Sequence, residues 1–291
     1  MKTWKRPFLL LALLAATTVI FIACQKDNSY NNNIPAGQNK LSVYLTDGPY
    51  DFQQVLVDIR SIAVKIDTCQ GFGDDDDDHH PGCDDHHDSV DRHCEIWDTL
   101  DINPGVYDLL SLRNGVDTLL ASGFVLNGKI ERIKLVLGDN NSIMVDSVVH
   151  PLHLFNNWNS VYINIHREHL DSLSSNNFQL YLDFDLARSI LYFNGNYWLK
   201  PVLKPFGRHS SGEIEGKVRP VHSYGTIYAF NDTDTSYAMP YSQGEFKIRG
   251  LQEGTYSLFI DGINGYRDTT ITDIMVRRNR EVKLGTIQLT Q

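Results

Sequence analysis

The fold class is decided by the segment Leu41-Ser42-Val43-Tyr44-Leu45, which ends at the turn cluster Asp47-Gly48-Pro49. Alternation with a period of two is typical of a β-strand with one buried face. Similar runs recur along the chain, whereas sustained apolar spacing of the helical kind is absent after the N-terminal segment. The sequence therefore predicts an all-β chain built as a sandwich. The expected strands are 41–45, 55–59, 61–66, 129–137, 142–149, 161–165, 178–184 and 197–203, with short helical pieces at 109–112 and 185–190.

A second domain is expected after the segment 205–212, where Pro, Gly and Ser gather as they do in linkers. Short strands separated by glycines follow this segment. We therefore expect two β-sandwich domains, at 39–206 and 212–291. The strands expected in the second domain are 213–218, 226–230, 245–248, 255–260, 269–271 and 281–289.

The N-terminal segment has the pattern of a targeting signal. Three basic residues precede the apolar run 8–22, which is too short for a comfortable membrane span, and the run ends at Ala23-Cys24. This pattern resembles the lipobox of bacterial lipoproteins. The resemblance implies a signal peptide at 1–23, lipidation of Cys24 and attachment to a membrane through the lipid. A retained membrane anchor is the alternative.

The polar stretch 24–38 has the composition of a flexible tether. Its start, Lys26-Asp27, also resembles the surface-export signals of some Gram-negative lipoproteins. We therefore expect an outer-membrane lipoprotein exposed at the cell surface, with a periplasm-facing protein as the alternative.

Four segments of the first domain resemble one known family. They are 41–49, 108–115, 182–190 and 199–202, in that order along the chain. Together they make residues 39–206 similar to the lipoprotein family called domain of unknown function 4382. The family has no established activity, so the resemblance implies a fold and a location but no chemistry.

The second domain is similar to the carboxypeptidase regulatory-like, prealbumin-type sandwich. The residues that show this are Gly244-Glu-Phe-Lys-Ile-Arg-Gly-Leu251 and Gly254-Thr-Tyr-Ser-Leu258. The resemblance implies a carbohydrate-binding-like fold. Some members of that fold group bind carbohydrate, which is a weak indication of the ligand.

The most unusual chemistry lies in the insertion 69–94, which holds nine aspartates, five histidines and one arginine. Imidazoles suit Zn²⁺, Cu²⁺ or Ni²⁺, whereas the aspartates suit Ca²⁺. A divalent-metal site is therefore one interpretation. Loose binding of several ions and a solvated acidic loop are the alternatives. The candidate ligands are His79, His80, Asp84, Asp85, His86, His87, Asp88 and His93.

Three cysteines remain once Cys24 is assigned to the lipid, and export permits a disulfide. A Cys69–Cys94 bond would close the base of the insertion. Cys83 would then be a free thiol or a soft metal ligand. A Cys83–Cys94 bond is the alternative.

Catalytic motifs are absent from the sequence, including those of serine hydrolases, zinc metalloproteases and nucleotide-binding enzymes. Asp183 and Asp185 could form the carboxylate pair of a glycoside hydrolase. We favour a structural interpretation, in which Asp185 caps a helix and Arg188 pairs with a carboxylate. Asp47 is interpreted as a turn former. The histidine pairs 150/153 and 166/169 are interpreted as exposed polar residues near strand ends.

The net charge and the aromatic residues indicate which partners to expect. Lys and Arg number 26 against 36 Asp and Glu, so a nucleic-acid partner is not expected. The sequence favours a non-enzymatic, lipid-anchored envelope protein with a binding or structural role, and its partners would be a metal ion, a glycan or an envelope protein. One alternative is a carbohydrate- or host-ligand-binding lipoprotein that uses exposed aromatics. The other is the hydrolase. The aromatic candidates are Trp97, Trp158, Tyr192, Tyr197 and Trp198.

Overall fold

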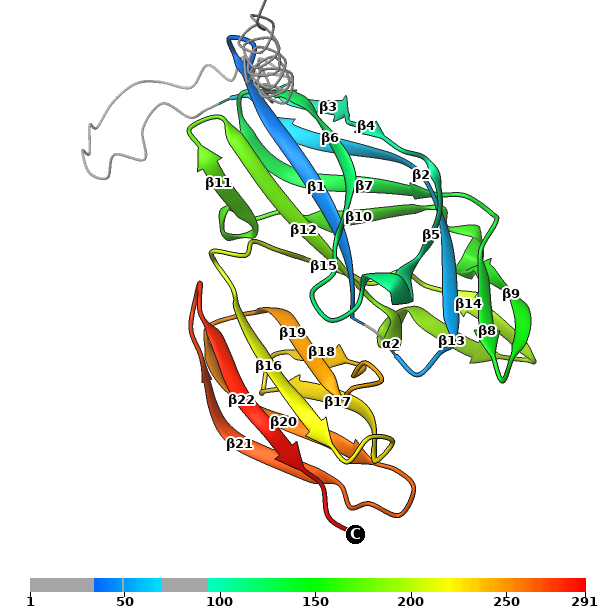
Figure 1. Ribbon diagram of the computed structural model, residues 1–291. Helices are drawn as coiled ribbons and strands as arrows, with labels where there is room; N and C mark the ends of the chain where they lie inside the picture. The colour runs from blue at the N-terminus through cyan, green and yellow to red at the C-terminus, as the bar shows by residue number, and fades with distance from the viewer. Residues whose placement is uncertain (1–33, 49, 70–93) are drawn as a thin grey trace, which may run out of the picture. The chain divides into compact units, whose positions relative to one another are not determined.

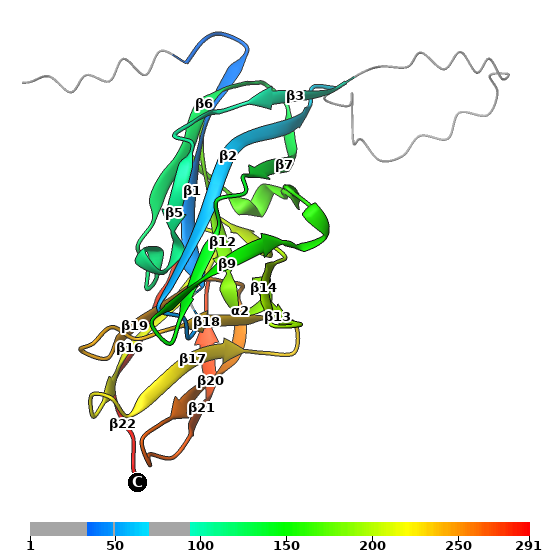
Figure 2. The ribbon, with the colours of Figure 1, turned by 90° about the vertical axis from the view of Figure 1, so that its right-hand side faces the viewer.

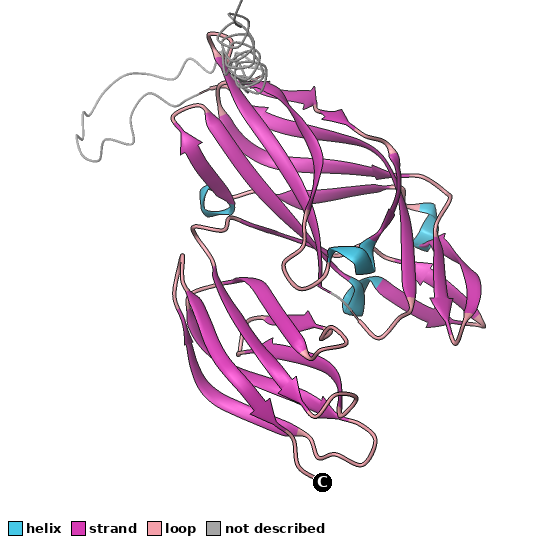
Figure 3. Cartoon of the chain, viewed as in Figure 1, coloured by secondary structure: helices cyan, strands magenta, loops and turns pink. Residues whose placement is uncertain are grey.

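The computed structural model describes residues 34–48, 50–69 and 94–291 (Figure 1). The expected signal peptide, Cys24, Cys83 and all eight candidate metal ligands lie outside these residues. Strands make up most of the described chain, and the helices are single short turns (Figure 3). The prediction of an all-β chain is confirmed. Among the described residues, none of the helices is both long and apolar enough to cross a membrane.

The first sandwich consists of a six-stranded and a nine-stranded sheet. The order of the smaller sheet is β11-β12-β1-β6-β4, with β15 also paired to β12. The order of the larger sheet is β10-β7-β2-β8-β9-β14-β13, with β3 and β5 also paired to β2. The strands are β1 (Gln38–Gly48), β2 (Gln54–Asp67), β3 (Glu95–Thr99), β4 (Asp101–Ile102), β5 (Gly105–Asp108), β6 (Thr118–Leu126), β7 (Lys129–Leu137), β8 (Ser142–Val145), β9 (Val148–Leu154), β10 (Ser160–Asn164), β11 (Leu170–Ser174), β12 (Asn177–Asp185), β13 (Ile190–Phe193), β14 (Asn196–Leu199) and β15 (Leu203–Phe206).

The core of this sandwich is filled from alternate positions of its long strands. Leu41, Val43 and Leu45 of β1 are fully buried, as are Leu180 and Leu182 of β12. β1 and β12 pair in parallel and lie side by side in both views (Figure 2). Four short helical turns connect the strands: η1 (Leu109–Leu112), η2 (Phe155–Asn157), η3 (Arg167–His169) and α2 (Leu186–Ser189).

Several of the expected strands have different boundaries in the structure, and the expected strand 197–203 is divided between β14 and β15. The segments 55–59 and 61–66 are one strand, β2, which is irregular between Ile59 and Ser61. Such a bulge moves the buried positions from odd to even numbers, so the sequence reads as two strands. Conversely, the run 142–149 divides into β8 and β9, because Asp146 and Ser147 have positive φ and form a tight turn.

The second sandwich packs a three-stranded sheet, β19-β16-β22, against a four-stranded sheet, β18-β17-β20-β21. Its core includes Ile214, Ile227, Tyr256 and Leu258. The prediction of two sandwiches is confirmed, and both belong to one compact unit, Pro35–Gln291. The strands are β16 (Gly212–Arg219), β17 (Tyr224–Phe230), β18 (Thr235–Ala238), β19 (Glu245–Leu251), β20 (Gly254–Gly262), β21 (Thr269–Val276) and β22 (Glu281–Gln288).

Side-chain hydrogen bonds join the two sandwiches within this unit. The Asn114 amide donates to the carbonyl of Met239 at 2.8 Å, and the Tyr241 hydroxyl donates to the carbonyl of Arg113 at 3.1 Å. The segment 113–117 of the first sandwich is therefore held by residues of the second.

Candidate functional site

The base of the Asp/His insertion is closed by a Cys69–Cys94 disulfide. This is the pairing that the sequence favours. The backbone and hydroxyl of Thr68 also donate to the carbonyl of Cys94, at 2.8 and 2.9 Å. Among the described residues, Asp67, Cys69 and Cys94 are the one group with metal-ligand chemistry in close proximity. Because both cysteines are in the disulfide, they have no thiolate to offer a metal, and metal binding by the insertion remains a prediction.

Asp185 has the structural role that the sequence predicts. Its side chain accepts a hydrogen bond from the backbone N–H of Arg188 at 3.0 Å and thereby caps α2. The other carboxylate oxygen accepts from Nε of Arg188 at 2.7 Å. Asp185 is buried, and both of its carboxylate oxygens accept hydrogen bonds from the same residue, Arg188. It is therefore not available as a nucleophile or a general acid.

Asp183 lies two residues earlier on β12, opposite Thr46 of β1 and Lys204 of β15. Burial raises its pKa to about 6, while Lys204 opposes the rise. The cavity beside it measures about 20 Å³, which is room for about one water molecule. A sugar ring does not fit there, so this geometry does not support the hydrolase alternative.

Asp47 is not a turn former, and this prediction is wrong. It continues the core-facing positions of Leu41, Val43 and Leu45 at the end of β1. The side chain is buried, and neither carboxylate oxygen has a hydrogen-bond partner among the described residues. Burial, together with the nearby charges of Asp183 and Asp185, raises its pKa well above the usual value. The sequence cannot show this, because Thr-Asp-Gly-Pro has the composition of an ordinary turn.

The four segments that suggested a known family meet at this end of the first sandwich. Asp47 is the last residue but one of β1, while η1 follows Asp108 and α2 follows Asp185. The fourth segment is tied to α2, because the backbone N–H of Val202 donates to the Ser189 hydroxyl at 2.9 Å and its carbonyl accepts from the backbone of Asp185 at 3.0 Å. These segments therefore form a buried structural node rather than a cleft.

The histidine pairs do not form metal sites with one another in the described structure. His166 and His169 flank the short turn η3, where the backbone N–H of His166 donates to Nδ1 of His169 at 3.1 Å. His150 and His153 lie three residues apart on β9. Since side chains alternate along a strand, the two imidazoles point to opposite faces.

A row of aromatic rings crosses β13, β14 and β9, with Tyr192 exposed and the other two half-buried. Tyr192 and Tyr197 are cross-strand partners with ring centroids 4.8 Å apart, and the next centroid, that of His150, lies 5.2 Å from Tyr197. Tyr192 is 66% exposed. We call Tyr192, Tyr197 and His150 the aromatic row. The tyrosines are among the aromatic candidates expected from the sequence, whereas His150 is not, because only the pairing of β9 with β14 brings it to them.

The other aromatic candidates lie elsewhere. Trp97 packs edge-on against Tyr162, near the opposite edge of the nine-stranded sheet. Trp198 contacts His153 on the face opposite the aromatic row, and Trp158 is exposed beside η2. The expected aromatics therefore do not form one common surface.

Residues 38–201 match the family described as Domain of unknown function (DUF4382). The chain belongs to the DUF4382 family. The match spans more than half of the sequence and contains three of the four segments of the buried node in full, and the fourth up to residue 201. The second sandwich lies beyond the residues matched to DUF4382.

Several solved structures show distant similarity to this DUF4382 chain. The minor pilin GBS52 of Streptococcus agalactiae is 10% identical, with 86% of this chain and 95% of the pilin covered, at a TM-score of 0.22. The shaft pilin SpaA of Lactobacillus rhamnosus GG is 9% identical, with 87% and 97% covered, at a TM-score of 0.22. The TIE protein of Bacillus anthracis is 10% identical, with 87% and 34% covered, at a TM-score of 0.21. Superpositions at this level do not indicate a shared function. The sequence matches no curated protein.

Proposed function

We propose that this chain is a non-catalytic, lipid-anchored protein of the outer membrane, exposed at the cell surface, that binds carbohydrate on its aromatic row. The observation that supports this function best is the cross-strand pair of Tyr192, which is 66% exposed, and Tyr197, a half-buried ring that packs against the core and lies beside Tyr192. A pyranose ring has an apolar C–H face that packs on such rings. Tyrosine combines that apolar surface with a hydroxyl that can hydrogen-bond a sugar.

The spacing of the row suits a chain of sugars better than a single ring. Neighbouring strands in a sheet lie about 4.8 Å apart, so one ring from each of three adjacent strands makes a continuous surface. The hairpin that joins β13 to β14 adds the exposed amides of Asn194 and Asn196 as hydrogen-bonding groups.

The charge of this region favours a neutral glycan. Residues 190–199 contain no charged side chain. An anionic polymer would meet no compensating charge on the hairpin, and the acidic protein as a whole would repel it. The ligand class that fits is therefore a neutral polysaccharide.

The test is affinity electrophoresis of the full-length chain through gels that contain neutral polysaccharides, such as xylan, mannan, starch and soluble β-glucan. At least one of them should retard the wild type, and the double variant Tyr192→Ala/Tyr197→Ala should migrate as in a plain gel. Tyr162→Ala is the matched control, because Tyr162 is 55% exposed on an edge strand of the same sheet. Equal loss of retardation in the control, or no retardation of the wild type, would contradict the proposal.

Divalent-metal binding by the Asp/His insertion is a second part of the proposed function. The disulfide at its base supports it, because it covalently closes the segment that contains the candidate ligands. Calorimetric titration of the full chain with Zn²⁺, Cu²⁺, Ni²⁺ and Ca²⁺ tests this proposal. We expect micromolar or tighter binding at whole-number stoichiometry that is lost when His79, His80, His86 and His87 become Ala. Weak multi-site binding that survives these substitutions would contradict a specific site.

A further inference from the structure

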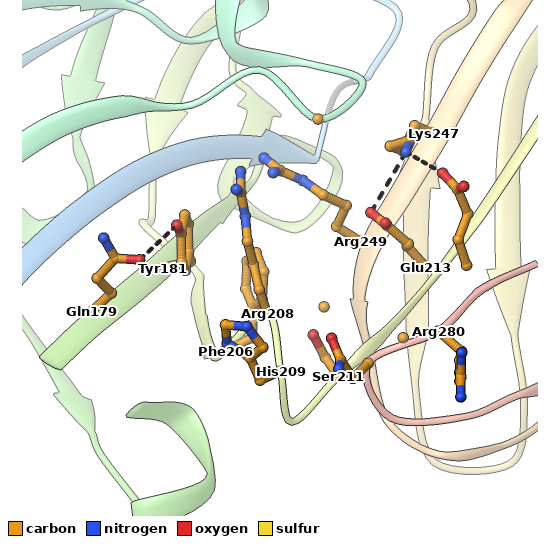
Figure 4. Close-up of a pocket in the computed structure, with 15 residues that line it drawn as sticks. Gln179, Tyr181, Phe206, Arg208, His209, Ser211, Glu213, Lys247, Arg249 and Arg280 are labelled. Carbon is orange, nitrogen blue, oxygen red and sulfur yellow. Dashed lines mark hydrogen bonds and ion pairs between the residues drawn. The ribbon is translucent and has the colours of Figure 1, made fainter. Parts of the chain in front are cut away.

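A second cavity lies within the compact unit, lined by residues of both sandwiches and of the segment between them (Figure 4). Its volume is about 550 Å³, which is within the range of small-molecule sites. Gln179 and Tyr181 of β12 line one side, and Lys247 of β19 and Glu281 of β22 line the other. None of its residues belongs to the aromatic row.

Two arginines at this cavity share a single carboxylate. Arg208 and Arg249 both bind Oδ2 of Asp117, the latter from Nη1 at 3.1 Å, and their guanidinium groups lie next to each other in Figure 4. Asp117 therefore neutralises only one of two positive charges. The excess charge makes this side of the cavity attractive to an anion.

The two guanidinium groups differ in how many of their N–H donors already have an acceptor. Arg249 is buried and also donates to the Thr46 hydroxyl and the Val116 carbonyl. The side chain of Arg208 is 46% exposed, and among the described residues its guanidinium reaches one acceptor, Asp117. A guanidinium has five N–H donors, so most of those on Arg208 remain available to a ligand.

Arg208 is held in position by an aromatic ring. Its guanidinium carbon lies 4.6 Å from the ring centroid of Tyr181, a cation–π contact that fixes the orientation of the side chain. Tyr181 is itself stacked against Tyr44 and Phe206, with centroids 5.0 and 5.4 Å away. Because neighbours cover both faces of Tyr181, the cavity has no slot in which a nucleobase could stack.

The opposite wall carries both signs of charge, because Lys247 and Arg280 line it together with Glu213 and Glu281. Nζ of Lys247 lies 3.7 Å from Glu213 and 3.2 Å from Glu215 and also pairs with Glu281. Lys283 is the other cation of this cluster, so three carboxylates face two ammonium groups. The carboxylates of this wall can accept hydrogen bonds from a ligand.

We infer that this cavity binds a sugar acid, with its single carboxylate on Arg208 and its hydroxyl groups donating to Glu213. A neutral sugar would leave the excess charge of the arginines without a partner. A simple anion such as phosphate has no sugar-ring hydroxyl groups to offer to Glu213. The inference does not depend on carbohydrate binding by the aromatic row, whose ligand is expected to be neutral.

The test compares ligands of the same ring shape but different charge. The full-length chain is titrated calorimetrically with glucuronate and galacturonate, with glucose and galactose as the uncharged counterparts and inorganic phosphate as a simple anion. We expect at least one sugar acid to bind about tenfold or more tightly than its neutral counterpart, as a charge-assisted hydrogen bond would provide. No preference for the acids, or equal binding of phosphate, would overturn the inference.

Two variants separate ligand binding from the structural role of the Asp117 contacts. Arg208→Gln and Asp117→Asn both break the Arg208–Asp117 ion pair. Arg208→Gln should remove the preference for the sugar acid, whereas Asp117→Asn should keep or strengthen it, because both guanidinium groups then lack a counterion. If both substitutions weaken binding equally, Arg208 serves only to hold the sandwiches together and the inference is wrong.

Discussion

Asp47 and Phe184 are register partners in the parallel pair of β1 and β12, and both side chains are buried in the first sandwich. Partners in a ladder point to the same face of a sheet. The carboxylate of Asp47 therefore shares the core with the Phe184 ring, without a hydrogen-bond partner among the described residues. Such a group destabilises the fold when it is ionised.

We predict that Asp47→Asn increases stability at neutral pH by about 1–3 kcal/mol, since it removes a buried charge. The raised pKa means that the folded state holds its proton more tightly than the unfolded state. The penalty is therefore absent below about pH 4 and grows as the pH rises, and urea unfolding at several pH values measures it. Asp139→Asn, at an exposed position, should change little. If Asp47→Asn instead lowers stability, the carboxylate holds a partner such as a cation.

The pKa of Asp183 gives a separate pH dependence. Because burial raises it to about 6, the stability of the folded state should fall as the pH rises from about 4 to about 6 and then remain lower. Asp183→Asn should raise stability at pH 7.5 by about 1–2 kcal/mol, a value reduced by the partial exposure of the side chain. The gain should vanish below about pH 4. Thermal unfolding across this range measures it, and a constant difference at every pH would contradict the assignment.

Asp185 should behave as a structural residue rather than a catalytic one. Asp185→Ala removes both the cap of α2 and a buried partner of Arg188, so we expect a loss of about 2–4 kcal/mol in unfolding free energy. Asp185→Asn keeps an oxygen that can cap the helix, so its unfolding free energy should fall by less than that of Asp185→Ala. Equal losses for the two variants would show that the cap contributes nothing.

The Cys69–Cys94 bond closes a loop with a sequence separation of 25. Replacing both cysteines with Ser should lower stability by roughly 3 kcal/mol, because the unfolded chain gains the freedom that the cross-link had removed. Cys83→Ser is the matched control and should leave the denaturation midpoint unchanged. If Cys83→Ser costs as much as the double substitution, then Cys83 takes part in the bond in solution.

Much of the fold could be predicted from sequence, because its long strands alternate clearly. β7 occupies the residues expected for it, and α2 lies within the expected helical piece. β18 was missed, because Thr-Ser-Tyr-Ala has no apolar alternation and pairs with β17 through tertiary contacts.

The sites were harder to predict than the strands. Arg208 and Asp117 are 91 residues apart, and nothing local in the sequence links them. The aromatic row could be predicted only in part, since its cross-strand neighbours depend on the order of strands in the sheet. The burial of Asp47 depends on packing around the end of β1, which its local sequence does not encode.

Carbohydrate binding by the aromatic row is tested most directly by comparing two substitutions of Tyr192. The wild type, Tyr192→Phe and Tyr192→Ala would each be titrated with the neutral polysaccharide that best retards the full-length chain. If sugar rings pack on the Tyr192 ring, Tyr192→Phe should keep most of the affinity and Tyr192→Ala should bind roughly tenfold more weakly. Equal affinity of all three proteins would contradict the claim, because the most exposed ring of the row would then take no part in binding.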